Sequence, residues 1–94
     1  MAYLMRTNGD IKKVKPNNRK VFTLGELQQH VGGYIEMVQL INNKTLVVND
    51  EGKIRQLPIN NYATLFTGIE IYGDVIVLDE DETDAMENLR DGDW

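Results

Sequence analysis

Turn-forming residues divide this 94-residue chain into short apolar segments, and this division limits what the chain can fold into. Asparagine, glycine and proline recur between the segments, at Asn8-Gly9-Asp10, Pro16-Asn17-Asn18, Gly32-Gly33, Asn42-Asn43 and Thr67-Gly68. The stretches between these turns have the length of short strands or short helices. A chain of this size buries one modest core. The sequence therefore predicts a single α+β domain over residues 1–78, with one or two short helices packed on a small antiparallel sheet.

Segments rich in branched or aromatic residues are predicted strands, and they lie at residues 2–6, 11–15, 34–41, 45–48 and 53–57. The Asn8-Gly9 pair is typical of a two-residue hairpin turn, so we expect the first two strands to pair. The last three are expected to form an antiparallel meander, with Gly52 in a left-handed turn position. Residues 74–78 are almost continuously apolar, which predicts a further strand that is covered on both faces.

A first helix is predicted at residues 24–31. The string Thr23-Leu24-Gly25-Glu26 before it is a capping box, in which the hydroxyl and the carboxylate each accept from a backbone N–H of the other residue. Leu27 and Val31 continue one apolar face along this helix. Gly32 suits the left-handed conformation that ends a helix.

A second, shorter helix is predicted at residues 61–66. Asn60 is a favourable N-cap residue, and Pro58 stops the strand before it. Tyr62, Ala63 and Phe66 would share one side of this helix.

The composition excludes several kinds of catalytic chemistry. Without cysteine the chain has no disulfide, thiolate metal site or cysteine nucleophile, and without serine it has no serine nucleophile. The one histidine, His30, falls on the polar face of the first helix, and no metal-ligand spacing or phosphate-loop motif is present. We therefore predict a protein that is not an enzyme and that holds no metal and no cofactor. An active site built only from carboxylates is the enzymatic alternative that stays open.

Charge is distributed unevenly, with basic residues concentrated before residue 24, acidic residues after residue 69, and a net charge of −5. A chain with this net charge repels phosphate, so we expect no direct nucleic-acid partner. No apolar run has the length of a membrane span or of a signal-peptide core, so we expect no membrane partner. A small domain without disulfides is typical of a reducing compartment, which predicts a cytoplasmic location.

An acidic C-terminal tail is predicted over residues 79–94, beginning with the run Asp79-Glu80-Asp81-Glu82. Two interpretations stay open for this tail. It is either a disordered, solubilising segment, or it contains a short helix near residues 83–89 that docks on a partner. In the second case its charge would imitate a nucleic acid and occupy a basic groove.

Three groups of residues outside the tail have the chemistry of a binding site. Gly32-Gly33-Tyr34 offers close backbone approach and an aromatic stacking face. Asn49 and Glu51 lie in a polar turn, and Asn60 and Thr64 lie at a helix start whose N–H groups can hold an anion. Each group also has a structural interpretation, as helix cap and strand entry, as hairpin turn, or as N-cap. With the acidic run included, the candidate ligand- or partner-binding residues are Gly32, Gly33, Tyr34, Asn49, Glu51, Asn60, Thr64, Asp79, Glu80, Asp81 and Glu82.

A family resemblance rests on five motifs, which are Val31-Gly32-Gly33-Tyr34-Ile35-Glu36, Val48-Asn49-Asp50-Glu51-Gly52-Lys53, Leu57-Pro58-Ile59-Asn60, Ala63-Thr64 and Gly73-Asp74-Val75-Ile76-Val77. In these motifs the chain resembles a domain-of-unknown-function family of small proteins, the one numbered 3846 in its series, found in bacteriophages, plasmids and the bacteria that carry them. The resemblance runs from about residue 21 to about residue 78, and the tail lies outside it. It implies a mobile-element protein in a bacterial cytoplasm and implies no activity.

Three hypotheses about function follow. The first is a non-catalytic counter-defence or host-takeover protein of a phage or mobile element, which binds and blocks a host protein with a basic surface. The second is a sponge for a small anionic ligand such as a nucleotide signal, held between protomers of a homodimer. The third is an enzyme with a carboxylate site.

Overall fold

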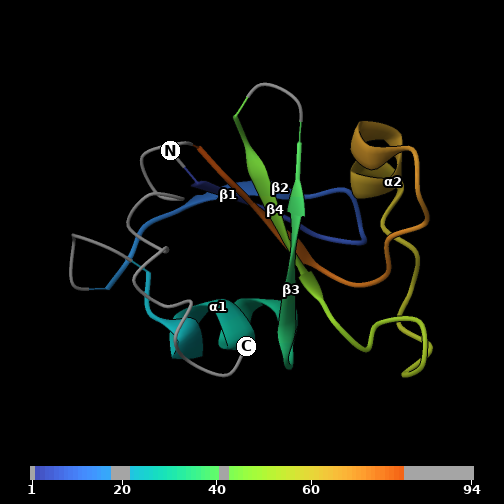
Figure 1. Cartoon of the computed structure of the whole chain (residues 1–94), viewed down its shortest axis with the longest axis horizontal. Coiled ribbons are helices and arrows are strands. Elements are labelled where there is room, and N and C mark those ends of the chain that lie inside the picture. Colours follow the sequence, from blue (N-terminus) through green and yellow to red (C-terminus); the bar gives the residue numbers. More distant parts are fainter. Residues whose placement is uncertain (1, 18–21, 41–42, 80–94) are drawn as a thin grey trace.

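A computed structural model describes residues 2–17, 22–40 and 43–79, which form a five-stranded antiparallel sheet and two short helices (Figure 1). The strands are β1 (Ala2–Met5), β2 (Ile11–Val14), β3 (Ile35–Gln39), β4 (Thr45–Asn49) and β5 (Val75–Leu78), and the helices are α1 (Leu24–Val31) and α2 (Asn61–Thr67). The order across the sheet is β2-β1-β5-β4-β3. This architecture confirms the predicted α+β class. No helix in the described ranges has the length and apolar character that crossing a membrane requires.

Strand β5, the last within the described residues, lies at the centre of the sheet. It pairs with β1 on one side and with β4 on the other, so that Ile76 lies opposite both Leu4 and Val47. It thereby joins two hairpins, β1–β2 and β3–β4, into one sheet. Every residue of β5 is buried, which confirms the expectation of a strand covered on both faces.

The sheet has an apolar cluster on each face. On one face, Phe22 and the α1 residues Leu27 and Val31 pack with Val47 and Ile76. The cluster on the other face contains Met5, Leu46, Val48, Ala63, Ile71, Val75 and Val77, of which Ala63 is the contribution of α2. Figure 1 accordingly shows the two helices on different sides of the strands. Alternation along each strand sends successive side chains to opposite clusters.

The capping box predicted for α1 is present. The Thr23 hydroxyl accepts from the Glu26 N–H at 3.2 Å, and the Glu26 carboxylate accepts from the Thr23 N–H at 3.2 Å. At the other end Gly32 has φ 84°, the left-handed conformation expected of it. Partial burial pushes the pKa of Glu26 upward, but hydrogen bonds from Asn17 and Thr23 and the nearby His30 outweigh that effect, so the pKa is lowered.

Glu26→Ala is expected to lower the free energy of unfolding by about 1 kcal/mol at neutral pH, because the carboxylate that accepts from the N–H groups of Thr23 and Asn17 is lost, while the bond from the N–H of residue 26 to the Thr23 hydroxyl remains. The pKa of Glu26 is lower in the folded protein than in the unfolded chain. Its contribution is therefore present above the unfolded pKa and is lost as the pH falls through the folded pKa. Urea unfolding at a series of acidic pH values measures this difference. Glu36→Ala, on an exposed position of β3, is the control, and an equal effect of both variants would contradict the prediction.

The expected third strand of the meander, residues 53–57, is absent, and this prediction was wrong. Residues 50–56 form consecutive turns, in which the Arg55 N–H donates to the Glu51 carbonyl at 2.9 Å and the Leu57 N–H to the Gly52 carbonyl at 3.0 Å. The edge of β4 pairs with β5 instead. Burial explains why β5 and not residues 53–57 pairs with β4. Strand β5 contributes residues to both apolar clusters, whereas Ile54 is 81% exposed.

Two turns also differ from their predicted forms. Gly52 is outside the left-handed region. It is required for space, because a Cβ there would lie 2.7 Å from the Tyr72 carbonyl oxygen. The β1–β2 hairpin is confirmed, but its loop has three residues rather than two. The Arg6 N–H donates to the Asp10 carbonyl at 2.9 Å, and Gly9 takes φ 95°.

Asn60 anchors the long connection between β4 and β5. Its side chain is fully buried, and its amide donates to the Met5 carbonyl at 2.9 Å and to the Gly73 carbonyl at 3.0 Å. Its amide oxygen accepts from the Ala63 N–H at 3.1 Å, which confirms the predicted N-cap of α2. The side chain thus joins the end of β1, the start of α2 and the turn before β5.

Asn60→Asp is expected to lower the free energy of unfolding by about 3 kcal/mol, since a carboxylate would face two buried carbonyl oxygens without a donor. Asn61→Asp is the matched control. Asn61 is exposed at the first turn of α2, where a negative charge is favourable, and we expect a change below about 0.5 kcal/mol. Chemical denaturation of both variants checks this. Similar stability of the two variants would contradict the structural role of Asn60.

Candidate functional site

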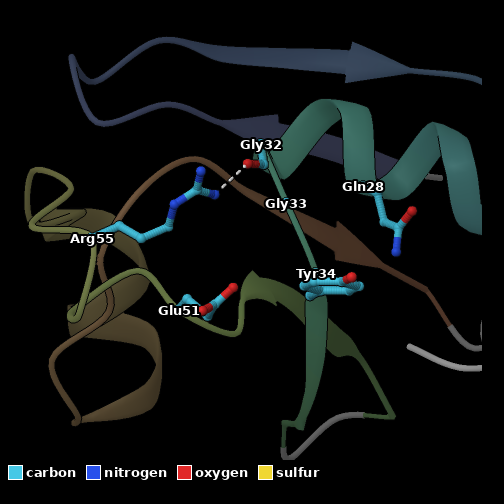
Figure 2. Close-up of a pocket in the computed structure, with 6 residues that line it drawn as sticks. All are labelled: Gln28, Gly32, Gly33, Tyr34, Glu51 and Arg55. Carbon is cyan, nitrogen blue, oxygen red and sulfur yellow. Dashed lines mark hydrogen bonds between the residues drawn. The ribbon is translucent and has the colours of Figure 1, made fainter.

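An open hollow lies at the C-terminal end of α1 (Figure 2). It has a volume of about 560 Å³ and is lined by Gln28, Gly32, Gly33, Tyr34, Glu51 and Arg55. Four of the candidate residues from the sequence, Gly32, Gly33, Tyr34 and Glu51, therefore come together. The two glycines join α1 to β3, and Glu51 and Arg55 come from the turns after β4. The hollow is thus built where two connections meet at one end of the sheet.

Asn49 fixes the two sides of this hollow relative to each other. Its side chain is buried. The amide nitrogen donates to the Val31 carbonyl at 3.0 Å, and the amide oxygen accepts from the Glu51 N–H at 2.8 Å. Both ends of the carboxamide are therefore occupied by the fold, and Asn49 positions Glu51 instead of lining the hollow itself.

Arg55 lines the hollow and was missed as a candidate residue. Its Nη1 donates to the Gly32 carbonyl at 3.0 Å (Figure 2), at the end of α1 where helix carbonyls lack intrahelical partners. In the strand predicted at residues 53–57, Arg55 would have had no relation to Gly32. Its position four residues after Glu51, in a segment of turns, brings both side chains to one hollow.

Tyr34 and Gly33 shape the remainder of the hollow. Tyr34 is 59% exposed, so its ring is open to a ligand and not packed in the sheet. A Cβ on Gly33 would lie 2.8 Å from Arg55 Nη1 and 3.2 Å from Asn49 Nδ2. Gly33 therefore leaves the space that the guanidinium occupies, which agrees with the interpretation that this glycine relieves crowding.

The remaining candidate residues lie elsewhere. The Asn60 side chain is committed to its three hydrogen bonds, and the Thr64 hydroxyl accepts from the Ile71 N–H at 3.1 Å. Asp79 lies at the end of β5, with its carboxylate 3.8 Å from Lys44 Nζ. The other three acids of the run, Glu80, Asp81 and Glu82, and the helix predicted near residues 83–89 lie outside the described residues. Within residues 2–17, 22–40 and 43–79, no group of three acidic or histidine side chains is arranged to hold a metal ion.

A second surface has a different character. Four exposed apolar residues, which we call the α2 face, lie on and just after α2: Tyr62, Leu65 and Phe66 share one side of the helix by their spacing of three and four residues, and Ile69 follows the helix. Leu65 is 82% exposed and Phe66 is 63% exposed. No residue of α2 is charged. The prediction that Tyr62, Ala63 and Phe66 share one side of this helix was wrong, because Ala63 is the buried residue of α2 and the two aromatic side chains face solvent.

The structure is therefore a small α+β domain with two exposed candidate surfaces, the hollow and the α2 face. A family model described as Domain of unknown function (DUF3846) matches residues 2–93, and the chain belongs to that family. The resemblance predicted from the sequence is confirmed. The match extends beyond residues 21–78 on both sides and includes most of the tail, which we had expected to lie outside the family pattern. A search of curated proteins and a search of solved structures each found no match.

Gly33→Ala is expected to displace the Arg55 guanidinium, the end of a flexible side chain, and to lower the free energy of unfolding by at most about 1 kcal/mol, the upper value of the exposed hydrogen bond to Gly32. Gly25→Ala is the control. A Cβ on Gly25 meets no atom within 4 Å, so this helical substitution should raise the free energy of unfolding by about 0.5–1 kcal/mol. Thermal and urea unfolding check both values. Stabilisation by both alanines would show that Gly33 does not leave space for Arg55.

Proposed function

We propose that this protein is a small non-catalytic binding protein that docks on another protein through the α2 face. The observation that carries the proposal is the set of large apolar side chains that α2 leaves exposed, with no charged residue among the helix positions. Single exposed apolar residues are ordinary on protein surfaces. A contiguous exposed group of aromatic and aliphatic side chains, by contrast, is typical of a protein–protein interaction site.

The partner should have an apolar groove with a basic rim. Acidic residues flank the α2 face, with Glu70 next to Ile69 and with Asp10 in the hairpin loop whose Gly9 lies against the Tyr62 ring. The Tyr72 hydroxyl donates to Glu70 at 2.5 Å, a bond that raises the pKa of Tyr72 and fixes the Glu70 carboxylate. Together with a net charge of −5, these acids favour a partner of opposite charge.

We further propose that this binding protein acts in phages and other mobile elements, where the family that the sequence resembles is found. The protein would bind and block a host protein in the bacterial cytoplasm, as a counter-defence or host-takeover factor. The alternative hypothesis is an enzyme with a carboxylate site, which would need an acidic side chain of raised pKa in a cleft.

Leu65→Glu is expected to weaken binding to the partner at least tenfold, because it places a charge at the centre of the apolar contact. Folding should be unaffected, since Leu65 makes little contact with the core and surface substitutions change stability by less than about 0.5 kcal/mol. Ile54→Glu is the matched control, because Ile54 is 81% exposed on a different segment. Host proteins captured by the wild type, and lost with Leu65→Glu but not with Ile54→Glu, would be purified and titrated to measure Kd.

Two outcomes would contradict the proposal. A purified partner that binds the wild type and Leu65→Glu with the same Kd would remove the α2 face from the interface. Light scattering that shows a stable dimer of the wild type, which Leu65→Glu converts to a monomer, would assign the α2 face to a second copy of the chain.

A further inference from the structure

We propose that the hollow beside Tyr34 binds the base of a guanine nucleotide. Tyr34 stacks on the purine ring, Arg55 donates to the acceptor edge of guanine, and Glu51 accepts from its donor edge. This site is separate from the α2 face: its residues come from the α1–β3 connection and from the turns after β4 (Figure 2). A negative result for nucleotide binding would therefore not contradict the proposed protein contact through the α2 face.

Arg55 supplies a planar set of N–H donors that is already held in place. One N–H of the guanidinium donates to the Gly32 carbonyl at 3.0 Å, and the other N–H groups of the fork remain for a ligand. A bidentate contact of arginine with O6 and N7 of guanine is the commonest base-specific contact of this side chain. Anchoring on a backbone carbonyl reduces the loss of side-chain freedom that such a contact otherwise requires.

Glu51 supplies the complementary acceptor. An ionised carboxylate only accepts hydrogen bonds, and guanine presents two neighbouring donors, N1–H and N2–H, on the edge adjacent to O6. The Glu51 N–H is fixed by the buried Asn49 side chain at 2.8 Å, so the backbone of Glu51 is positioned. Adenine would present an amino group to Arg55 and an unprotonated N1 to Glu51, and both contacts would be repulsive.

The shape of the hollow suits a stacked base. The Tyr34 ring is exposed beside the two glycines (Figure 2), and aromatic side chains are the usual stacking surface for bases. The volume of about 560 Å³ falls within the range of roughly 300–1,000 Å³ that small-molecule sites have. The absence of a Cβ on Gly33 leaves room for the Arg55 guanidinium at the wall of the hollow.

The charges in the hollow point to recognition of the base rather than the phosphate. Arg55 and Glu51 carry opposite charges at one site, so they leave little net attraction for an anion. The net charge of the chain, −5, also disfavours phosphate. We therefore expect guanosine to bind almost as tightly as guanosine monophosphate, with the phosphate directed to solvent.

The test is a titration of the full chain with guanosine monophosphate and with adenosine monophosphate, followed by calorimetry and by amide chemical shifts. We expect saturable binding of the guanine nucleotide, weaker binding of the adenine nucleotide by about tenfold or more, and shift changes at Gly32 and Gly33 but not at Leu65. Glu51→Gln and Arg55→Lys should each weaken guanine binding by about tenfold or more. Asp50→Asn, next to Glu51 but outside the hollow, should leave it unchanged.

Several results would overturn the proposal. These are no saturable binding of guanosine monophosphate at millimolar concentration, equal affinity for the adenine nucleotide, or full binding by a folded Glu51→Gln variant. Much tighter binding of a guanine-rich single-stranded RNA, with a strong dependence on salt, would replace the free nucleotide by a nucleic acid as the ligand.

Discussion

The buried carboxamide of Asn60 determines where the last strand enters the sheet. It links the end of β1, the start of α2 and the turn before β5 through three hydrogen bonds of 2.9–3.1 Å. Because a buried amide without partners is costly, these bonds favour one arrangement of the three segments. β5 is thereby placed beside β1, and its other edge is left for β4. The joining of the two hairpins into one sheet follows from this placement.

Asn49 has the same function at the start of the connection between β4 and β5. It ties the start of that connection to the end of α1, as Asn60 ties its middle to β1. The connection carries Glu51 and Arg55 in the hollow, and it also carries the α2 face. Both candidate surfaces therefore depend on two buried asparagines that are themselves unavailable to a ligand.

Local features of this fold could be predicted from the sequence, whereas strand pairing, for which distant segments compete, could not. The capping box at Thr23, the left-handed Gly32 and the cap at Asn60 depend on neighbouring residues, and each is present. Residues 53–57 were predicted to pair with β4 because they follow it closely in the chain. The structure pairs β4 with β5 instead, because β5 buries more apolar surface there. Arg55 was missed for the same reason. The sequence around an asparagine at a turn does not reveal whether its side chain is exposed or buried, so Asn49 and Asn60 were predicted to be ligand-binding residues.

The two helices of this chain provide an internal comparison that bears on the meaning of the α2 face. α1 buries Leu27 and Val31 and presents Gln28, Gln29 and His30 on its outer surface, as a helix that only covers a sheet requires. α2 buries Ala63 alone and presents Leu65 and Phe66 outward. Both helices lie in the same solvent and on the same sheet, so solubility would favour polar residues on each. Stability of the isolated fold does not require the exposed apolar side chains of α2, whereas the proposed contact with a second molecule would use them.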